Sequence, residues 1–323
     1  MAHELTTRAD GFTEMAFVGD TPWHGLGQRL DQSADISTWR TAAGFDWEIL
    51  SAPVQYTPVL SDHTTMQYTG QRVLHRSDNN MPLSVVSDRY KPVQPIEVLE
   101  FFRDLVEQNG FRLHTAGTLF GGKRLWALAE TGKFAEVSKG DGVGGFLLLS
   151  TSADKSLATT ARFTTVRVVC NNTLSMATSR DGQMVSYTHA TAFKKEAMQE
   201  KLAMAVESFG GYIEMAKTLR QQKMSADRAS DFVKTLILKS EKLQDEQYDQ
   251  EKNRAYRKIM DLFNGEAKGV ELAGNTKWGL LNAITEYYDH HHPARTQDAR
   301  LNKTWFGSGD ARKASAAEAL LVA

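Results

Sequence analysis

Three consecutive pairs of strand-like segments constrain the fold of this chain more than any other feature of its sequence. Each pair alternates or runs apolar on both sides of a short polar or glycine-containing turn, which is the pattern of a β-hairpin. The pairs cover residues 67–76 and 82–86, 111–119 and 123–130, and 145–152 and 157–169. Successive hairpins predict an antiparallel or mixed sheet, because each hairpin pairs its own two strands.

Helical periodicity accompanies and follows these hairpins. A short helix is expected over 33–43 and a longer one over 96–108, where apolar residues recur at three- and four-residue spacing. A helical start is also expected at 174–177, after Asn171, Asn172 and Thr173 as candidate caps. The last third reads as helices over 191–220, with Gly210 and Gly211 as a kink, 225–238 and 244–263.

The predicted fold is therefore α+β, with a sheet of hairpins backed by helices and a mostly helical C-terminal third. Glycines interrupt any period before residue 33, and Trp23 is expected to anchor this segment onto the core. We predict three parts: an irregular N-terminal arm over 1–32, an α+β core over 33–190 and a helical region over 191–323.

Composition excludes several classes of protein. Apolar runs such as 146–149 are far shorter than the roughly 18 to 20 residues that cross a bilayer. The first residues lack a basic start followed by an apolar stretch, so a secretory signal is not expected. A lone cysteine, Cys170, cannot form an internal disulfide. These features predict a cytoplasmic protein without a membrane partner. If a phage encodes the protein, the compartment is the cytoplasm of the host cell.

Charge is distributed unevenly along the chain. Residues 1–110 carry 8 Lys and Arg against 15 Asp and Glu, whereas residues 155–228 carry 11 against 6. Charge imbalances of this size are common on solvated surfaces. The alternative, to which we give equal weight, is an anion-binding face in the middle of the chain.

Motifs for catalysis, metal or cofactor binding are weak. Three adjacent residues, His290, His291 and His292, cannot all face one ion on a helix, because consecutive side chains point about 100° apart. A structural or capping role is the preferred interpretation. Cys170 precedes a predicted helix start, yet a lone cysteine behind a strand is usually a small core residue. The glycine-rich segments 121–123 and 140–145 lack the spacing of a phosphate-binding loop. We expect no enzyme activity, no metal and no cofactor.

A basic, hydroxyl-rich region is the strongest candidate for binding. If 157–169 is a regular strand, Arg167 shares one face with Phe163 and Thr165, and Arg162 lies on the other. Such a strand offers phosphate donors, and Phe163 or Tyr187 can stack a base. The alternative is that these are exposed strand residues that favour β-structure and protect the edge of the sheet. The candidate nucleic-acid-binding residues are Lys155, Arg162, Arg167, Asn171, Asn172, Arg180 and Lys194.

Five short motifs follow one another along the chain. They are Trp-His-Gly-Leu-Gly at 23–27, Val-Leu-His-Arg at 73–76 before Asp78, Val85 and Val86 with Arg89 and Tyr90, Val-Val-Cys-Asn-Asn-Thr-Leu at 168–174, and Trp-Gly-Leu-Leu-Asn-Ala-Ile-Thr-Glu-Tyr at 278–287 before Asp289 and His290. Taken in this order, they resemble the phage/plasmid-like protein family built around a domain of unknown function, DUF932. The resemblance implies an accessory gene of a phage, plasmid or integrative element, with no settled activity. In outline the fold is similar to phage single-strand annealing recombinases, by analogy alone.

These observations support competing functional hypotheses. The first is a phage or mobile-element DNA-metabolism protein that binds single-stranded DNA. Its finer form is a single-strand annealing or recombination accessory role, and the protein could act as a homo-oligomer. The cations near the C-terminus that could take part are Arg295, Arg300, Lys303, Arg312 and Lys313. The second is a host-takeover or anti-defence factor whose acidic N-terminal surface binds a host protein. An enzyme that uses Cys170 or His290 is the third.

Overall fold

The computed structural model describes residues 5–19, 25–59, 64–167, 169, 172–175, 184–189, 209–238, 246–295 and 297–322. The chain forms two compact units. Unit 1 contains residues 1–131, 147–162 and 184–203, and unit 2 contains residues 132–146, 163–183 and 204–323. The predicted α+β class is confirmed, and the division into three parts at 32 and 190 stays a prediction.

The larger sheet has eight strands in the order β10-β9-β8-β7-β6-β1-β2, with β11 paired to β9. Its strands are β1 (Met15–Val18), β2 (Gln28–Leu30), β6 (Arg112–Leu119), β7 (Arg124–Ser138), β8 (Asp141–Ser152), β9 (Thr159–Arg167), β10 (Asn172–Ser175) and β11 (Met184–Tyr187). The β1–β2 pair is parallel, and β6 pairs antiparallel with both β1 and β7. Strands β7, β8 and β9 each contribute residues to both units.

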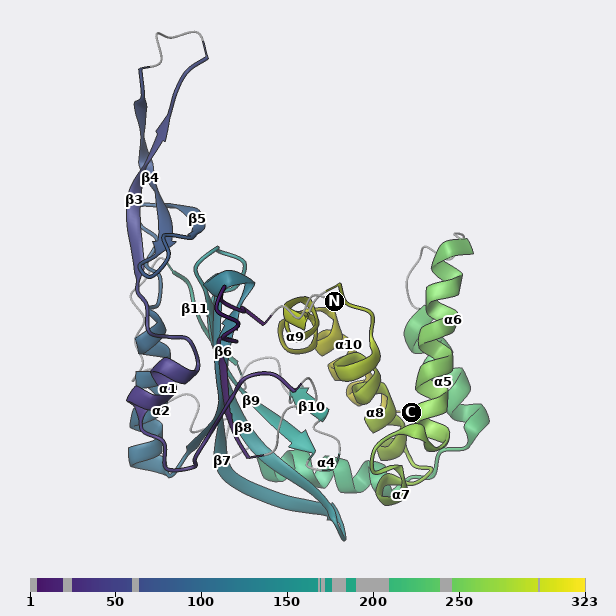
Figure 1. The fold of residues 1–323 in the computed structure, drawn as a ribbon. Coiled ribbons are helices and arrows are strands. Elements are labelled where there is room, and N and C mark those ends of the chain that lie inside the picture. The colour runs from purple at the N-terminus through teal and green to yellow at the C-terminus, as the bar shows by residue number, and fades with distance from the viewer. Residues whose placement is uncertain are drawn as a thin grey trace. The chain divides into compact units, whose positions relative to one another are not determined.

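The second sheet is antiparallel and belongs to unit 1. It consists of β3 (Ile49–Tyr56), β4 (Met66–Arg76) and β5 (Pro82–Ser87), in that order. Strand β5 pairs with β4 between Gln71 and His75 only, so β3 and β4 continue beyond it as a two-stranded ribbon. Figure 1 shows this ribbon extending away from the remainder of unit 1.

Two helices complete the described part of unit 1. Helix α1 (Ile36–Ala42) begins at Asp35, whose side chain accepts a hydrogen bond from the Thr38 amide, as an N-cap does. Helix α2 (Pro95–Asn109) directs Phe101 and Phe102 into the core. A 3₁₀ turn, η1 (Phe120–Gly122), joins β6 to β7.

Unit 2 is mostly helical, and α8 lies at its centre. Every residue of α8 is buried, and its Trp278 contacts Tyr212 of α4 edge to face. The helical elements are α4 (Phe209–Gln221), α5 (Ala226–Leu238), α6 (Glu246–Asp261), η2 (Leu262–Glu266), α7 (Val270–Ala273), α8 (Lys277–Glu286), η3 (Tyr287–His291), α9 (Gln297–Phe306) and α10 (Ser308–Val322). Within the described ranges, no helix combines the length and apolar character needed to span a membrane.

The structure differs from the sequence prediction in two places. The segment 1–32 was expected to be irregular, yet it supplies β1 and β2, and all four β1 side chains are buried. The expected helical start at 174–177 is wrong at Leu174 and Ser175, which belong to β10 and pair with β9. The helix predicted over 191–220 is described from residue 209 onward, with Gly210 and Gly211 in its first turn, and Trp23 lies outside the described residues.

Candidate nucleic-acid interface

Arg167 was expected to contact phosphate, but it is a buried structural residue of unit 2. Its side chain is 3% exposed, and its Nε donates to the Asp141 carboxylate at 2.5 Å. Its Nη2 donates to the backbone carbonyl of Gly269 at 2.9 Å. The other Asp141 oxygen accepts from the indole nitrogen of Trp278 at 2.9 Å. Arg167 is therefore poorly placed to bind a phosphate. If its guanidinium turned outward, the Asp141 carboxylate would stay buried without an opposite charge.

The other predicted residues are scattered. Lys155 is exposed in the turn between β8 and β9, and Arg162 is half-buried on β9, where it pairs with Met184 of β11. Asn172 is on β10, opposite Arg167. The residues Asn171, Arg180 and Lys194, together with Cys170, lie outside the described part of the chain.

The hydroxyl groups of β9 do not form a phosphate-binding face. Thr159 and Thr160 are buried and contact hydroxyls on β8, Thr151 at 2.8 Å and Ser150 at 2.9 Å. Thr164 and Thr165 are also buried. The hydroxyls of Thr159 and Thr160 thus find partners across the sheet, as buried polar groups generally do. All four threonines are buried, so their hydroxyls are not presented to a phosphate.

The structure instead brings together three segments of unit 1 that carry cations. Two of these cations follow β5, one directly precedes β7, one is the first residue of β7, and one lies in the β8–β9 turn. We name this set the basic cluster, and its members are Arg89, Lys91, Lys123, Arg124 and Lys155. Three of the five are exposed, Lys123 is half-buried and Arg124 is buried.

Hydrogen bonds join the three segments that carry the basic cluster. The Lys155 ammonium donates to the Val85 carbonyl at 2.9 Å, which joins the β8–β9 turn to β5. The Ala153 amide donates to the Lys123 carbonyl at 2.8 Å, and Arg124 Nη2 donates to the Ser156 hydroxyl at 2.7 Å. These contacts join the same turn to the start of β7, so the three segments lie side by side.

The electrostatic balance of these segments is positive. Residues 84–91, 120–124 and 153–157 carry the five cations and two carboxylates, Asp88 and Asp154. Burial lowers the pKa of the Arg124 guanidinium, and the nearby Asp154 charge opposes that shift. A desolvated cation of this kind favours an anionic ligand, because the ligand restores the solvation that burial removed.

An aromatic side chain borders the basic cluster. Phe120 in η1 is 36% exposed, and the Arg124 guanidinium lies 5.7 Å from its ring centroid. Phe120 and Lys155 both have positive φ angles, 55° and 66°. Residues other than glycine rarely adopt this left-handed conformation, and such positions are enriched at functional sites. Exposed aromatic rings beside cations are the arrangement on which single-stranded nucleic acids stack.

The acidic N-terminal region uses several of its carboxylates internally. Glu14 is buried and accepts from Arg76 Nη2 at 2.6 Å, and Arg76 also donates to Asp78 at 2.7 Å. Arg8 bridges Glu14 and Asp46 at 2.8 and 2.5 Å. Burial alone would raise the pKa of Asp78, but the Arg76 hydrogen bond and charge lower it overall. The charge excess of this region is therefore only partly available to a partner.

The cations near the C-terminus mostly bind backbone carbonyls. Lys313 is buried and pairs with Asp289 at 2.6 Å. Arg300 Nη1 donates to the carbonyls of His290 and His292 at 2.9 and 3.0 Å. The remaining contacts are Lys303 to Pro293 O and Arg312 to Leu236 O. Arg295 is exposed.

The three adjacent histidines lie at the end of η3. His292 stacks on Tyr288 with 5.5 Å between ring centroids, and its amide donates to the Tyr287 carbonyl. Among the residues that the structure describes, no group of three or more His, Cys, Asp or Glu side chains is placed to hold a metal ion. The observed contacts are those of a helix terminus.

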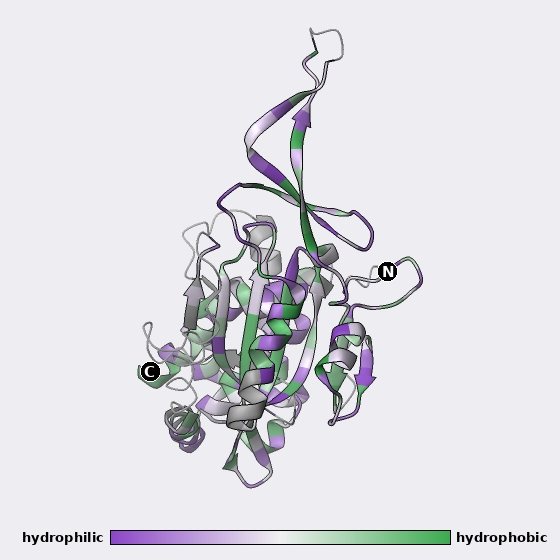
Figure 2. Ribbon diagram, turned by 90° about the vertical axis from the view of Figure 1, so that its left-hand side faces the viewer, coloured by the Kyte–Doolittle hydropathy of each residue, from purple (hydrophilic) through white to green (hydrophobic). Residues whose placement is uncertain are grey.

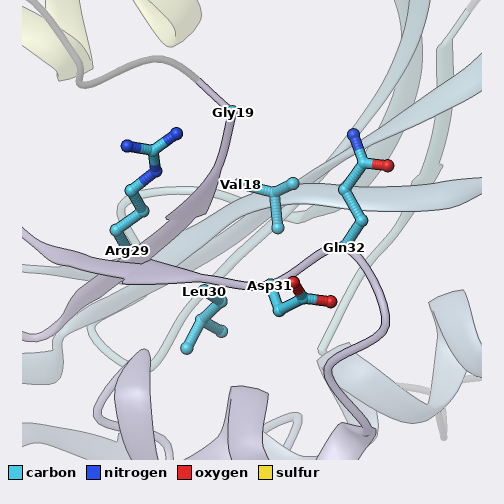
Figure 3. A pocket seen from close by; sticks show the side chains of 6 residues that line it. All are labelled: Val18, Gly19, Arg29, Leu30, Asp31 and Gln32. Carbon is cyan, nitrogen blue, oxygen red and sulfur yellow. The ribbon is translucent and has the colours of Figure 1, made fainter.

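A separate hollow of about 460 Å³ lies at the β2 edge of the large sheet (Figure 3). It is lined by Val18, Gly19, Arg29, Leu30, Asp31 and Gln32. The Asp31 carboxylate accepts from the amide and hydroxyl of Ser33, which lowers its pKa. Since this carboxylate serves the local turn, we assign no ligand to the hollow.

Fold and site together define a mixed α+β protein with a positively charged turn cluster. The family model described as "Domain of unknown function (DUF932)" matches residues 82–305, which is more than half of the chain. The protein therefore belongs to this family. No curated protein and no solved structure matches the chain.

Proposed function

We propose that this protein binds single-stranded DNA through the basic cluster, as a DNA-metabolism protein of a phage or other mobile element. The observation that carries the proposal is that hydrogen bonds join three segments that carry five cations, with the exposed ring of Phe120 beside Arg124. Cations neutralise the phosphates and the ring stacks a base, which together define sequence-tolerant single-strand binding. A single-strand annealing or recombination accessory role is the finer form of this proposal.

Segments outside the helices and strands carry four of the five residues of the basic cluster, and Arg124 is the first residue of β7. A duplex is usually read by a helix or β-ribbon inserted into the major groove, whereas a stacking ring needs an unpaired base. The preferred ligand is therefore the single strand, and a duplex competitor displaces it poorly.

The test is fluorescence anisotropy with a labelled single strand of about 40 nucleotides across a salt series. The test variant is Arg89→Gln/Lys91→Gln/Lys155→Gln, which removes three exposed cations of the basic cluster. The matched control is Lys217→Gln/Arg228→Gln/Lys234→Gln, which removes the same residue types from positions on α4 and α5. Each lost phosphate contact lowers the slope of log affinity against log salt by about 0.7, so three lower it by about 2.

A second variant separates stacking from charge. Phe120→Ala removes the ring, and loss of one stacked base costs about 1–3 kcal/mol, or roughly 5- to 150-fold in affinity, without changing the salt slope. The proposal is wrong if wild type fails to bind at low salt, or if the α4 and α5 control weakens binding as much as the basic-cluster variant. In that case capture of a host protein by the N-terminal region becomes the leading hypothesis.

A further inference from the structure

The outer part of the β3–β4 ribbon is a second surface, separate from the basic cluster. Residues 54–56 pair with residues 66–68, beyond the last contact of β5 with β4 at Gln71. Figures 1 and 2 show from two directions that this segment, which we name the distal ribbon, stands clear of the sheet below it. A register shift after Pro53 separates the distal ribbon from the inner part of the sheet.

The two faces of the distal ribbon differ in polarity. The register pairs Val54 with Tyr68 and Tyr56 with Met66, and residues two apart on a strand share a face. These four apolar side chains therefore form one face. Gln55 pairs with Gln67 on the opposite face. We name the first set the apolar face.

The apolar face is exposed to solvent. Tyr56, Met66 and Tyr68 are 47%, 49% and 50% exposed. Alternation of this kind is typical of a strand with one face packed against a core. A two-stranded ribbon alone is marginally stable in water and gains stability when its apolar face is covered. A partner is therefore expected at this face.

Charge argues against a nucleic acid as that partner. Residues 49–71 contain no lysine or arginine, and Asp62 is their one carboxylate. Binding a polyanion depends on cations that release counterions from phosphates, and this ribbon has none. Two tyrosines and a methionine in an uncharged setting have instead the composition of the centre of a protein interface.

The same features favour a second copy of the chain. An uncharged face is free of like-charge repulsion when it meets itself about a two-fold axis, which is the commonest symmetry of homo-oligomers. The free edge of β4 at residues 66–69 also lacks the proline and lysine that normally discourage pairing, whereas β3 carries Pro53. Neither the apolar face nor the β4 edge at residues 66–69 carries a charged side chain that would repel a second copy.

We propose that two copies of the protein associate through the apolar faces of their distal ribbons. Fully buried aromatic side chains each cover roughly 150–250 Å², so this contact lies at or below the roughly 1,200 Å² lower limit of stable specific interfaces. The dimer is therefore concentration-dependent. This inference is independent of DNA binding, and association itself is measured without nucleic acid.

Sedimentation velocity across the micromolar range tests the proposal. The wild-type mass is expected to rise from that of one chain, 36.0 kDa, towards that of two. Tyr56→Ser/Met66→Ser/Tyr68→Ser is expected to weaken association at least tenfold. The matched control, Gln55→Ser/Thr65→Ser/Gln67→Ser, changes the polar face and is expected to associate as wild type does.

Thermal unfolding followed by circular dichroism checks that both triple variants are folded. If the apolar-face variant is not, Tyr68→Lys replaces it, because like charges then meet across the axis. A wild type that stays monomeric throughout, or a polar-face control that dissociates equally, overturns the proposal. It is also overturned if the folded apolar-face variant associates normally but loses binding to a labelled single strand, since the occupant is then nucleic acid.

Discussion

Replacing Asp141 by asparagine is expected to destabilise unit 2 severely. The substitution keeps the shape of the side chain but removes the charge that faces Arg167 at 2.5 Å. Asp141 is completely buried and Arg167 is 3% exposed, so water cannot replace the lost carboxylate. Removing one partner of a buried pair costs about 3–5 kcal/mol, because it leaves an uncompensated buried charge. That is a large share of a typical stability of about 5–15 kcal/mol.

Urea denaturation followed by tryptophan fluorescence measures this loss. Trp278, which donates to Asp141, is one of the six tryptophans that contribute to this emission. With a slope of about 3 kcal/mol/M, the urea midpoint falls by roughly 1–2 M. The control Asp231→Asn, at an 81% exposed position on α5, is expected to leave the midpoint unchanged.

A double variant tests the physical reasoning more sharply. Asp141→Leu/Arg167→Met removes both charges together, and apolar replacement of a buried pair is often close to neutral. It is therefore expected to be more stable than either Asp141→Leu or Arg167→Met alone. A midpoint for Asp141→Asn within about 0.3 M of wild type would refute the argument, since that shift is about 1 kcal/mol.

Two further predictions concern unit 1. The pKa of Asp78 is lowered in the folded protein by Arg76. The stability that the Asp78 carboxylate contributes is therefore present above its unfolded pKa and is lost as the pH falls through the lower, folded pKa. The stability difference between wild type and Asp78→Asn, measured by urea midpoints, should be full at pH 7 and disappear in acid, with the decline beginning near pH ~4. Gly122→Ala is expected to cost about 2–5 kcal/mol in free energy of unfolding, because φ is 92° and the new Cβ would lie 2.7 Å from the Trp47 ring. The control Gly132→Ala, where φ is 73° and no atom lies within 4 Å, should cost only the backbone strain of about 1–2 kcal/mol, and equal losses at both glycines would contradict the steric argument.

Local patterns were sufficient to predict most of the elements. The hairpins over 67–86 and 111–130 were predicted from the alternation of apolar and polar residues around a turn, which involves only neighbours in sequence. The structure has β4–β5 and β6–β7 at those places. The stripe of 96–108 likewise became α2. The helix prediction at 174–177 was wrong at Leu174 and Ser175, because both are held in β10 by pairing with β9. Tertiary pairing overrides a weak local preference.

The candidate site was harder to predict because it depends on contacts distant in sequence. Nothing near Arg167 in sequence indicates that Asp141 neutralises it from 26 residues away. The reverse holds for Lys123 and Lys155, which look ordinary in sequence and whose segments are joined by hydrogen bonds from Ala153 to Lys123 and from Arg124 to Ser156. Composition located a basic region, but solvent exposure decides which of its cations can meet a phosphate.

The interleaving of the two units has a consequence for how the chain can be divided. The backbone passes from one unit to the other after residues 131, 146, 162, 183 and 203. No single cut yields a fragment that holds all of one unit and none of the other. During synthesis, residues 132–146 and 163–183 of unit 2 leave the ribosome before the helices that follow residue 203. A fragment that begins at residue 204 would therefore contain the helices of unit 2 without the strand residues that belong to the same unit.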